Sequence, residues 1–187
     1  MPKIVDHEQR HEEIVRALWQ VIAEHGIEGV SLRVVAQAAG VSIGRIQHYF
    51  ASREALVLAG LTRLIDQAVG AYQGTSDAPP RDRLFHVLSQ QVPRTEPGRM
   101  GVAVWYAYLA TAITDTRIRQ ILAEALRVGE TECAAHVRAM REVGAAEALA
   151  VSRRLLALSD GLTLRVLAGG LDADEAIAVL HAEVDAL

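Results

Sequence analysis

Residues 7 to 11 read HEQRH, which has the spacing of a zinc-peptidase motif. Two histidines at this spacing share one face of a helix and could hold a metal ion, with Glu8 between them as general base. No third ligand follows at the spacing such enzymes use, because His25 lies too far along the same helix. We therefore expect an exposed, charged helix here. A helical metalloprotein or hydrolase built on His7, Glu8 and His11 stays the alternative.

Cys133 and His136 form a second pair that could do chemistry, because they are three residues apart and share a helix face. A thiol beside an imidazole is the beginning of a nucleophilic dyad. Nothing in the sequence orients the base, and a lone helical cysteine is more often a small core residue. This dyad belongs to the same alternative. We predict no enzyme activity, no metal and no cofactor.

Composition favours an all-α protein of the cytoplasm. Of the 187 residues, 51% are hydrophobic and only 4% are aromatic, so small aliphatic side chains must fill the core. The single cysteine excludes an internal disulfide, which fits a reducing compartment. The sequence shows no signal-peptide pattern, and its longest uncharged run, 100–114, is too short to span a membrane.

Helical periodicity predicts about nine helices in two domains. The expected helices are 7–25, 32–39, 43–49, 52–73, 81–92, 98–114, 115–144, 146–168 and 173–186. The segment GTSDAPP at 74–80 is the clearest linker. We expect an N-terminal three-helix domain over 8–68 and a C-terminal helical domain over 81–187.

The segment 31–50 predicts a helix-turn-helix motif. Ser31 and Ser42 are placed to cap two short helices, and Gly40 between them is free to take positive φ. The apolar residues expected to pack the motif are Val35, Val41, Ile46 and Phe50.

The charge pattern of this segment suits a nucleic-acid partner, although the net charge of the chain is −4. From Ser31 to Arg53 there is no Asp or Glu, while Arg33, Arg45 and Arg53 supply positive charge. The local sign of a surface matters more for phosphate than the sum over the chain.

The segment SLRVVAQAAGVSIGRIQHYF (31–50), with its flanks up to the S-R-E of residues 52–54, resembles the DNA-binding domain of TetR-family transcriptional regulators. VWYAYLA (104–110) and DGLTLR (160–165) are similar to the branch of that family that contains choline-pathway repressors. The resemblance implies a homodimer that binds a double-stranded DNA operator and responds to a small-molecule effector.

Side-chain chemistry divides the expected DNA contacts into two groups. Arg45 suits guanine and Gln47 suits adenine, while Gly44 lets the helix approach the groove closely. Hydroxyls, rings and charges at the helix starts suit phosphate. The full set is Ser31, Arg33, Ser42, Ile43, Gly44, Arg45, Gln47, His48, Tyr49, Ser52 and Arg53. The family most often has an aromatic where this chain has Gln47.

An aromatic cluster suggests an effector pocket in the C-terminal half. Trp105, Tyr106 and Tyr108 gather in an otherwise aliphatic helix. With residues of facing helices they give an expected lining of Met100, Trp105, Tyr108, Leu122, His136, Met140 and Leu156. The alternative is that these aromatics only pack the core.

Helix 146–168 is apolar on nearly its whole circumference, which predicts burial on several sides. A second copy of the chain would cover it and helix 173–186 in a four-helix interface. The residues expected there are Leu155, Leu158, Leu162, Val166, Ile177, Leu180 and Val184. Burial inside one subunit is the alternative.

These features together predict a ligand-responsive repressor. Two recognition helices would enter successive major grooves of a pseudo-palindrome, about 34–36 Å apart. Effector binding would be transmitted through helix 52–73. A helical binding module with a vestigial helix-turn-helix motif is a further alternative, and activation uses the same contacts as repression.

Overall fold

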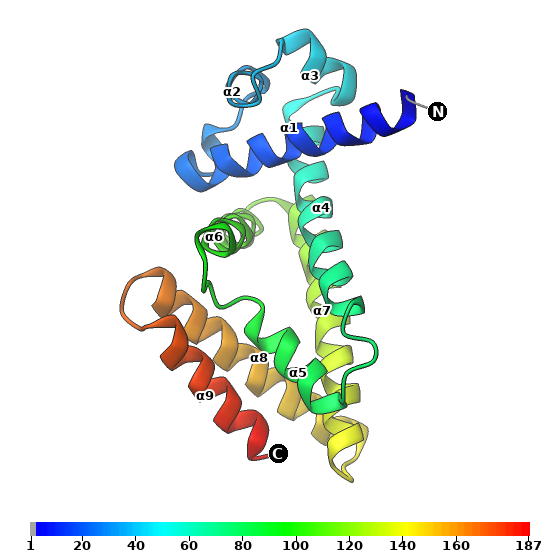
Figure 1. Ribbon diagram of the computed structural model, residues 1–187, viewed down its shortest axis with the longest axis vertical. Coiled ribbons are helices and arrows are strands. Elements are labelled where there is room, and N and C mark those ends of the chain that lie inside the picture. Colours follow the sequence, from blue (N-terminus) through cyan, green and yellow to red (C-terminus); the bar gives the residue numbers. More distant parts are fainter. Residues whose placement is uncertain (1–2) are drawn as a thin grey trace. The chain divides into compact units, whose positions relative to one another are not determined.

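The computed structural model describes residues 3–187, and within them the chain is all-helical (Figure 1). Its elements are α1 (Lys3–His25), η1 (Ile27–Gly29), α2 (Leu32–Ala38), α3 (Ile43–Tyr49), α4 (Arg53–Gln73), α5 (Pro80–Ser89), α6 (Glu96–Thr111), α7 (Thr116–Met140), α8 (Ala145–Leu167) and α9 (Ala173–Asp185). The all-α class and every expected helix are confirmed. The short 3-10 turn η1 is the one element that periodicity did not predict.

Helix ends differ from the expected ones where a capping residue was overlooked. Thr95 Oγ1 accepts a hydrogen bond from the amide of Gly98 over 3.2 Å, so α6 begins at Glu96 rather than at residue 98. Pro80 occupies the first turn of α5, where its missing N–H costs nothing.

The chain folds into two compact units that are not contiguous in sequence. The first holds the residues up to Asp66 together with Ala103–Ile121, and the second holds Gln67–Val102 and Leu122–Leu187. Helices α4, α6 and α7 therefore each contribute to both units. This division differs from the predicted domains 8–68 and 81–187, because part of α6 packs with the N-terminal helices.

Tyr108 is the α6 residue that anchors this packing in the first unit. Its side chain is fully buried, and its hydroxyl donates to the carbonyl oxygen of Val57 on α4 over 2.8 Å. Tyr108 is thus a core residue of the first unit, and its predicted place in the lining of an effector pocket stays a prediction. Periodicity placed it on the face of Trp105 but could not say which helix that face meets.

Helix α1 crosses α4 at Gly60, where the contact leaves no room for a side chain. A Cβ atom at Gly60 would lie 2.4 Å from Cδ2 of Leu18 and 2.8 Å from the Tyr108 hydroxyl. Trp19 Nε1 donates to the carbonyl oxygen of Gly60 over 3.1 Å. Gly60 is therefore required by the close approach of its neighbours, and it holds together the body that carries α2 and α3.

The second unit has its core between α5, α8 and α9, which lie side by side (Figure 1). Phe85 of α5 stacks on His181 of α9 with ring centroids 3.7 Å apart. Ser159 of α8 donates to the carbonyl oxygen of Leu88 over 2.5 Å. The buried face of α8 thus includes polar residues. The sequence of this helix had indicated an apolar surface on nearly every side.

Four residues predicted for a subunit interface lie instead in this core. They are Leu155, Val166, Leu180 and Val184, none more than 6% exposed. Their burial against α5 and against one another leaves them little surface for a second copy of the chain. The other three, Leu158, Leu162 and Ile177, are half-buried.

Among residues 3–187, no helix combines the length and the apolar character that crossing a membrane requires.

Candidate nucleic-acid interface

The α2–α3 pair is built by two serine caps and one glycine, as predicted. Ser31 Oγ accepts from the amide of Val34, and Ser42 Oγ accepts from the amide of Arg45, each over 3.2 Å. Gly40 has a φ of 64°, a conformation that other residues rarely adopt. These local features alone end α2, turn the chain and start α3.

Helix α3 exposes almost all of its surface. Ile46 is its only buried residue, at 0% exposure, and it packs inward with Val35 and Phe50. Val41, the fourth residue expected there, is half-buried. The exposed positions are Ile43, Gly44, Arg45, Gln47 and His48. A helix of seven residues with one buried side chain contributes little to stability by itself, so its surface invites a functional explanation.

Two observations on α3 point to close contact with another molecule. A Cβ atom at Gly44 would meet nothing within 4 Å, so the fold gives no reason for a glycine there. Its neighbour Ile43 is 46% exposed, and Val34 on α2 is 37% exposed. A partner that approaches the backbone at Gly44 and covers apolar surface at Ile43 would account for both.

Arg33 at the start of α2 and Arg45 on α3 are exposed cations. Ser31 and Ser42 are occupied as caps, but each uses only its oxygen as an acceptor, so its O–H remains able to donate to a phosphate. Ser52 likewise accepts from the amide of Ala55 over 3.1 Å at the start of α4.

Arg53 differs from the other expected phosphate contacts. Its Nε donates to the carbonyl oxygen of Val30 over 2.7 Å, and its Nη2 donates to that of Ile27 over 2.6 Å. The guanidinium is therefore held by the chain itself, and it fastens the start of α4 to η1. We assign Arg53 a structural role in place of the predicted phosphate contact.

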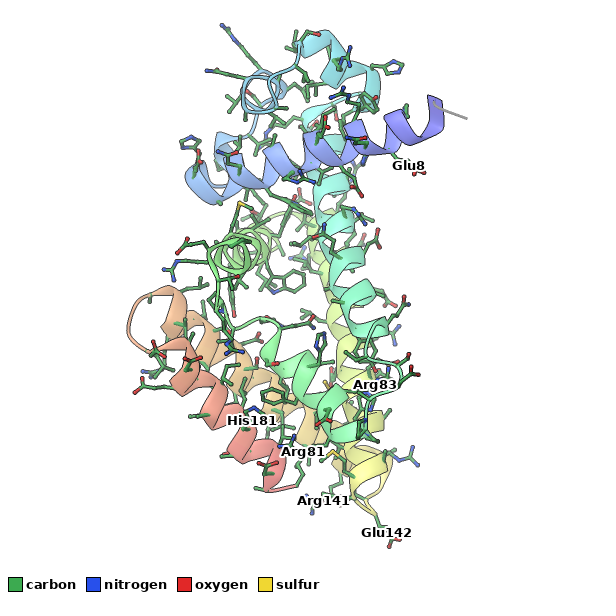
Figure 2. The ribbon with its side chains drawn as sticks, viewed as in Figure 1. Glu8, Arg81, Arg83, Arg141, Glu142 and His181 are labelled. Atoms are coloured by element: carbon green, nitrogen blue, oxygen red, sulfur yellow. The ribbon has the colours of Figure 1, made fainter. Side chains whose placement is uncertain are left out.

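The histidines of HEQRH face α3. His7 packs on Tyr49 with ring centroids 4.6 Å apart, and His11 packs on Phe50 at 4.9 Å. Glu8 lies on the side of α1 that faces away from α3 (Figure 2). The side chain that a peptidase would use as a base thus points away from both imidazoles. Among the described residues, no group of three or more His, Cys, Asp or Glu could hold a metal ion.

The Cys133–His136 pair is not a dyad either. Burial raises the pKa of the Cys133 thiol to about 12, which suppresses the thiolate. The Nε2 atom of His136 lies 2.7 Å from the Tyr72 hydroxyl, which itself donates to Glu132 over 2.8 Å. Since the phenol gives its proton to Glu132, His136 must donate to the phenol oxygen.

Sequence reasoning missed this polar cluster in the second unit, which joins three helices. Tyr72 comes from α4, Glu132 and His136 come from α7, and Arg83 of α5 lies over the Tyr72 ring, 4.6 Å from its centroid. Burial is the main cause that lowers the pKa of His136, and the positive charge of Arg83 adds to it. Tyr72 and Arg83 lie far from α7 in the sequence, so no local sequence pattern connects these two residues with Glu132 and His136.

The residues predicted to line an effector pocket are divided between the units. Trp105 and Tyr108 belong to the first, and the other five belong to the second. Leu122 and His136 are buried there, while Met100, Met140 and Leu156 are half-buried. The second unit also holds Asp160 of α8, a carboxyl whose pKa is raised by burial. Asp160 is the first residue of the DGLTLR segment, and that segment was the signal in the sequence that could have identified it.

Comparison with known families matches nearly the whole described chain. Residues 14–59 match the model of bacterial regulatory proteins of the tetR family. Residues 80–187 match the model of the C-terminal domain of BetI-type transcriptional repressors.

Individual relatives agree with these matches. The transcriptional regulator BetI of Burkholderia cenocepacia is 29% identical over 193 residues, covering 100% of this chain and 98% of BetI. The regulator PksA of Bacillus subtilis is 33% identical over 114 residues, which are 60% of this chain and 56% of PksA.

Two solved structures are similar along most of their length. A TetR-family regulator from a Rhodococcus species has a TM-score of 0.83 at 26% identity and covers 95% of this chain and 98% of its own. A regulator from Saccharomonospora viridis, solved in complex with choline, has a TM-score of 0.83 at 24% identity and covers 95% and 96%. The second likeness concerns the fold alone.

Proposed function

This chain belongs to the TetR family of DNA-binding transcriptional regulators, with a C-terminal region of the BetI type, and we propose that it is a homodimeric cytoplasmic repressor that an effector releases from a pseudo-palindromic operator. The observation that carries the proposal is α3, which is capped at its start, held by the buried Ile46 and exposed at every other position except the half-buried Tyr49.

We propose that the exposed face of α3 enters the major groove and contacts the base edges. Arg45 would donate to guanine and Gln47 would pair with adenine, each at about 1–3 kcal/mol of discrimination. Ile43 would contact a thymine methyl group. The bare backbone at Gly44 would let the helix approach the base pairs closely.

Phosphate contacts would fix the position of this helix on the duplex. Arg33 supplies charge, and the O–H groups of Ser31 and Ser42 supply donors at two helix starts. His48 and Tyr49 at the end of α3 would reach the backbone on the other side of the groove.

The proposed subunit interface is the outer face of α8 and α9. Its most exposed large residues are Leu164, 49% exposed, and Val179, 40% exposed. Small exposed residues surround them: Ala157 and Gly161 on α8 with Ala168 directly after it, and Ala178 and Ala182 on α9 with Ala186 directly after it. Small residues let two helix pairs approach closely, and Leu158, Leu162 and Ile177 would lie at the margin.

A compact organic cation is the proposed effector class. Asp160 is an acidic group in the second unit, and burial raises the pKa of its carboxyl. An acidic side chain in this unit would favour a cationic ligand over an anionic one. The choline in the complex of the Saccharomonospora viridis regulator belongs to this class, and it is the first compound to test.

Binding-site selection tests the function. Purified protein is incubated with a random duplex library, and the enriched sequence is assayed by fluorescence anisotropy with and without choline. We expect a two-fold symmetric sequence whose binding choline weakens. Neutral 3,3-dimethylbutanol, which has the shape of choline without its charge, should have no effect. Failure to enrich any sequence would refute the proposed function, whereas a response to neither compound would refute only the effector class.

A further inference from the structure

Five rings meet where α1 passes the end of α3. His7 lies 4.6 Å from Tyr49 and 6.3 Å from His48, measured between ring centroids. His11 lies 4.9 Å from Phe50 and 6.5 Å from Tyr49. His48 and Tyr49 are themselves 5.3 Å apart in an edge-to-face arrangement. All but the His48–Tyr49 contact join α1 to the end of the helix-turn-helix motif.

The spacing of HEQRH explains how α1 reaches this place. His7 and His11 are one helical turn apart, so they project from the same face of α1. They contact two consecutive residues, Tyr49 and Phe50, which close α3 and lead into α4. Ile46 is the only buried residue within α3, and these ring contacts support its C-terminal end together with the burial of Phe50.

The two histidines have different surroundings. His11 is half-buried, and its pKa is lowered chiefly by burial and further by the charges of His7 and Arg63. His7 and His48 are exposed.

We propose that HEQRH is a proton-sensitive positioning element of the recognition helix. His7 and His11 hold Tyr49 and Phe50 in place, and protonation of His7 beside the DNA backbone strengthens operator binding. The inference rests on the proposed function, since it requires α3 to lie against DNA.

The charged groups around the cluster set the sign of this effect. His11 and His48 are the titratable neighbours of His7, and Arg63 adds positive charge next to His11. Glu12 is paired with Arg63, and Glu8 lies on the opposite side of α1 (Figure 2). Operator binding would bring the negative charge of DNA phosphate to the exposed His7, so it should take up protons.

The test uses an operator selected at pH 8 and measures its affinity by fluorescence anisotropy from pH 5.5 to 8 at constant ionic strength. For the wild-type protein we expect affinity to rise about three- to tenfold between pH 7.5 and pH 6, since one proton taken up gives at most tenfold per unit. His7→Phe keeps a ring against Tyr49 but removes the proton. It should bind like wild type at pH 8 and lose most of the rise.

His7→Ala removes both ring and proton, so it should bind more weakly than His7→Phe at every pH. His25→Gln is the matched control, because His25 is an exposed histidine at the far end of α1. Its pH profile should equal that of wild type.

Each outcome is decisive. Operator binding with a flat wild-type profile, or a His7→Phe profile as steep as that of wild type, overturns the proton linkage. Equal affinity of His7→Ala and His7→Phe at pH 8 overturns the positioning role. Absence of an operator at any pH refutes the proposed function itself and this inference with it.

Discussion

Arg53 donates from Nη2 to the carbonyl oxygen of Ile27 over 2.6 Å, so the first residue of α4 is fastened to the turn that follows α1. Its Nε makes a second bond of 2.7 Å to Val30. The two carbonyls lie in the loop between α1 and α2. The charged guanidinium of Arg53 takes the place of water as their hydrogen-bond donor. Arg53, which was expected to contact DNA, thus stabilises the part of the first unit that holds α3 in place.

Replacing Arg53 with alanine should reduce stability more than DNA affinity. Two carbonyls lose a charged donor, and we expect a loss of about 2–4 kcal/mol in the free energy of unfolding, measured by urea denaturation. The salt dependence of operator binding should stay as in wild type. Arg33→Ala is the control, because it should leave stability unchanged and flatten the salt slope by about 1. A flattened slope for Arg53→Ala would restore its phosphate contact.

Gly44→Ala should separate stability from binding. The added methyl group meets nothing in the protein, and alanine favours a helix over glycine, so the melting temperature should hold or rise by the equivalent of about 0.5–1 kcal/mol. Operator affinity should fall at least tenfold, because the methyl group would stand between α3 and the base pairs. Unchanged affinity would show that DNA does not approach this backbone.

Arg45→Ala should loosen sequence preference without unfolding the protein. We expect the discrimination between the operator and single-base variants to fall by about 1–3 kcal/mol at one position of each half-site. Gln47→Ala should act at a neighbouring position. Competition binding with a panel of variant duplexes measures both effects. If Arg45→Ala weakened all duplexes equally, Arg45 would contact phosphate instead of a base.

Acid should destabilise the protein partly through His136. Burial lowers the pKa of His136 in the folded state, so below the ordinary value of about 6.5 the unfolded chain takes up a proton that the folded chain refuses. Stability is therefore present above that pH and is lost as pH falls. His136→Gln should make the urea midpoint fall less between pH 7.5 and 5.5. His11 shifts in the same direction and should retain part of the loss. An equal fall in the variant would exclude His136 as a source.

Leu164→Glu should produce monomers. A charge at the centre of the proposed α8–α9 face would be buried against its symmetry mate, which is strongly unfavourable. Sedimentation equilibrium should give the mass of one chain, and operator affinity should drop with it. Leu126→Glu is the matched control, because Leu126 of α7 is 45% exposed and lies outside this face. A dimeric Leu164→Glu protein would place the interface elsewhere.

Local signals predicted the local structure. Ser31, Ser42 and Gly40 each act on backbone within four residues, so their positions in the sequence were sufficient to place α2, the turn and α3. The exposed face of α3 followed from the same register, since Ile46 is the one residue whose position the core requires.

The sequence could not predict contacts between residues that are far apart in the chain. Arg53 and Ile27 are 26 residues apart, and nothing in the chain marks their contact. The polar residues on the buried face of α8 illustrate the same point. Ser159 is tolerated there because a carbonyl of α5 accepts its proton, and only the folded structure reveals that acceptor. Leu155, which looked equivalent to the other leucines around α8, therefore lies in the core of its own subunit.

The recognition helix is anchored by one side chain, which has a consequence for how such a regulator diversifies. Substitutions at Ile43, Arg45 and Gln47 change nothing that the core depends on, so the half-site preference is free to drift while the melting temperature stays constant. Duplicated copies of this gene would acquire different operators through a few surface substitutions, before the cores that support α3 diverged.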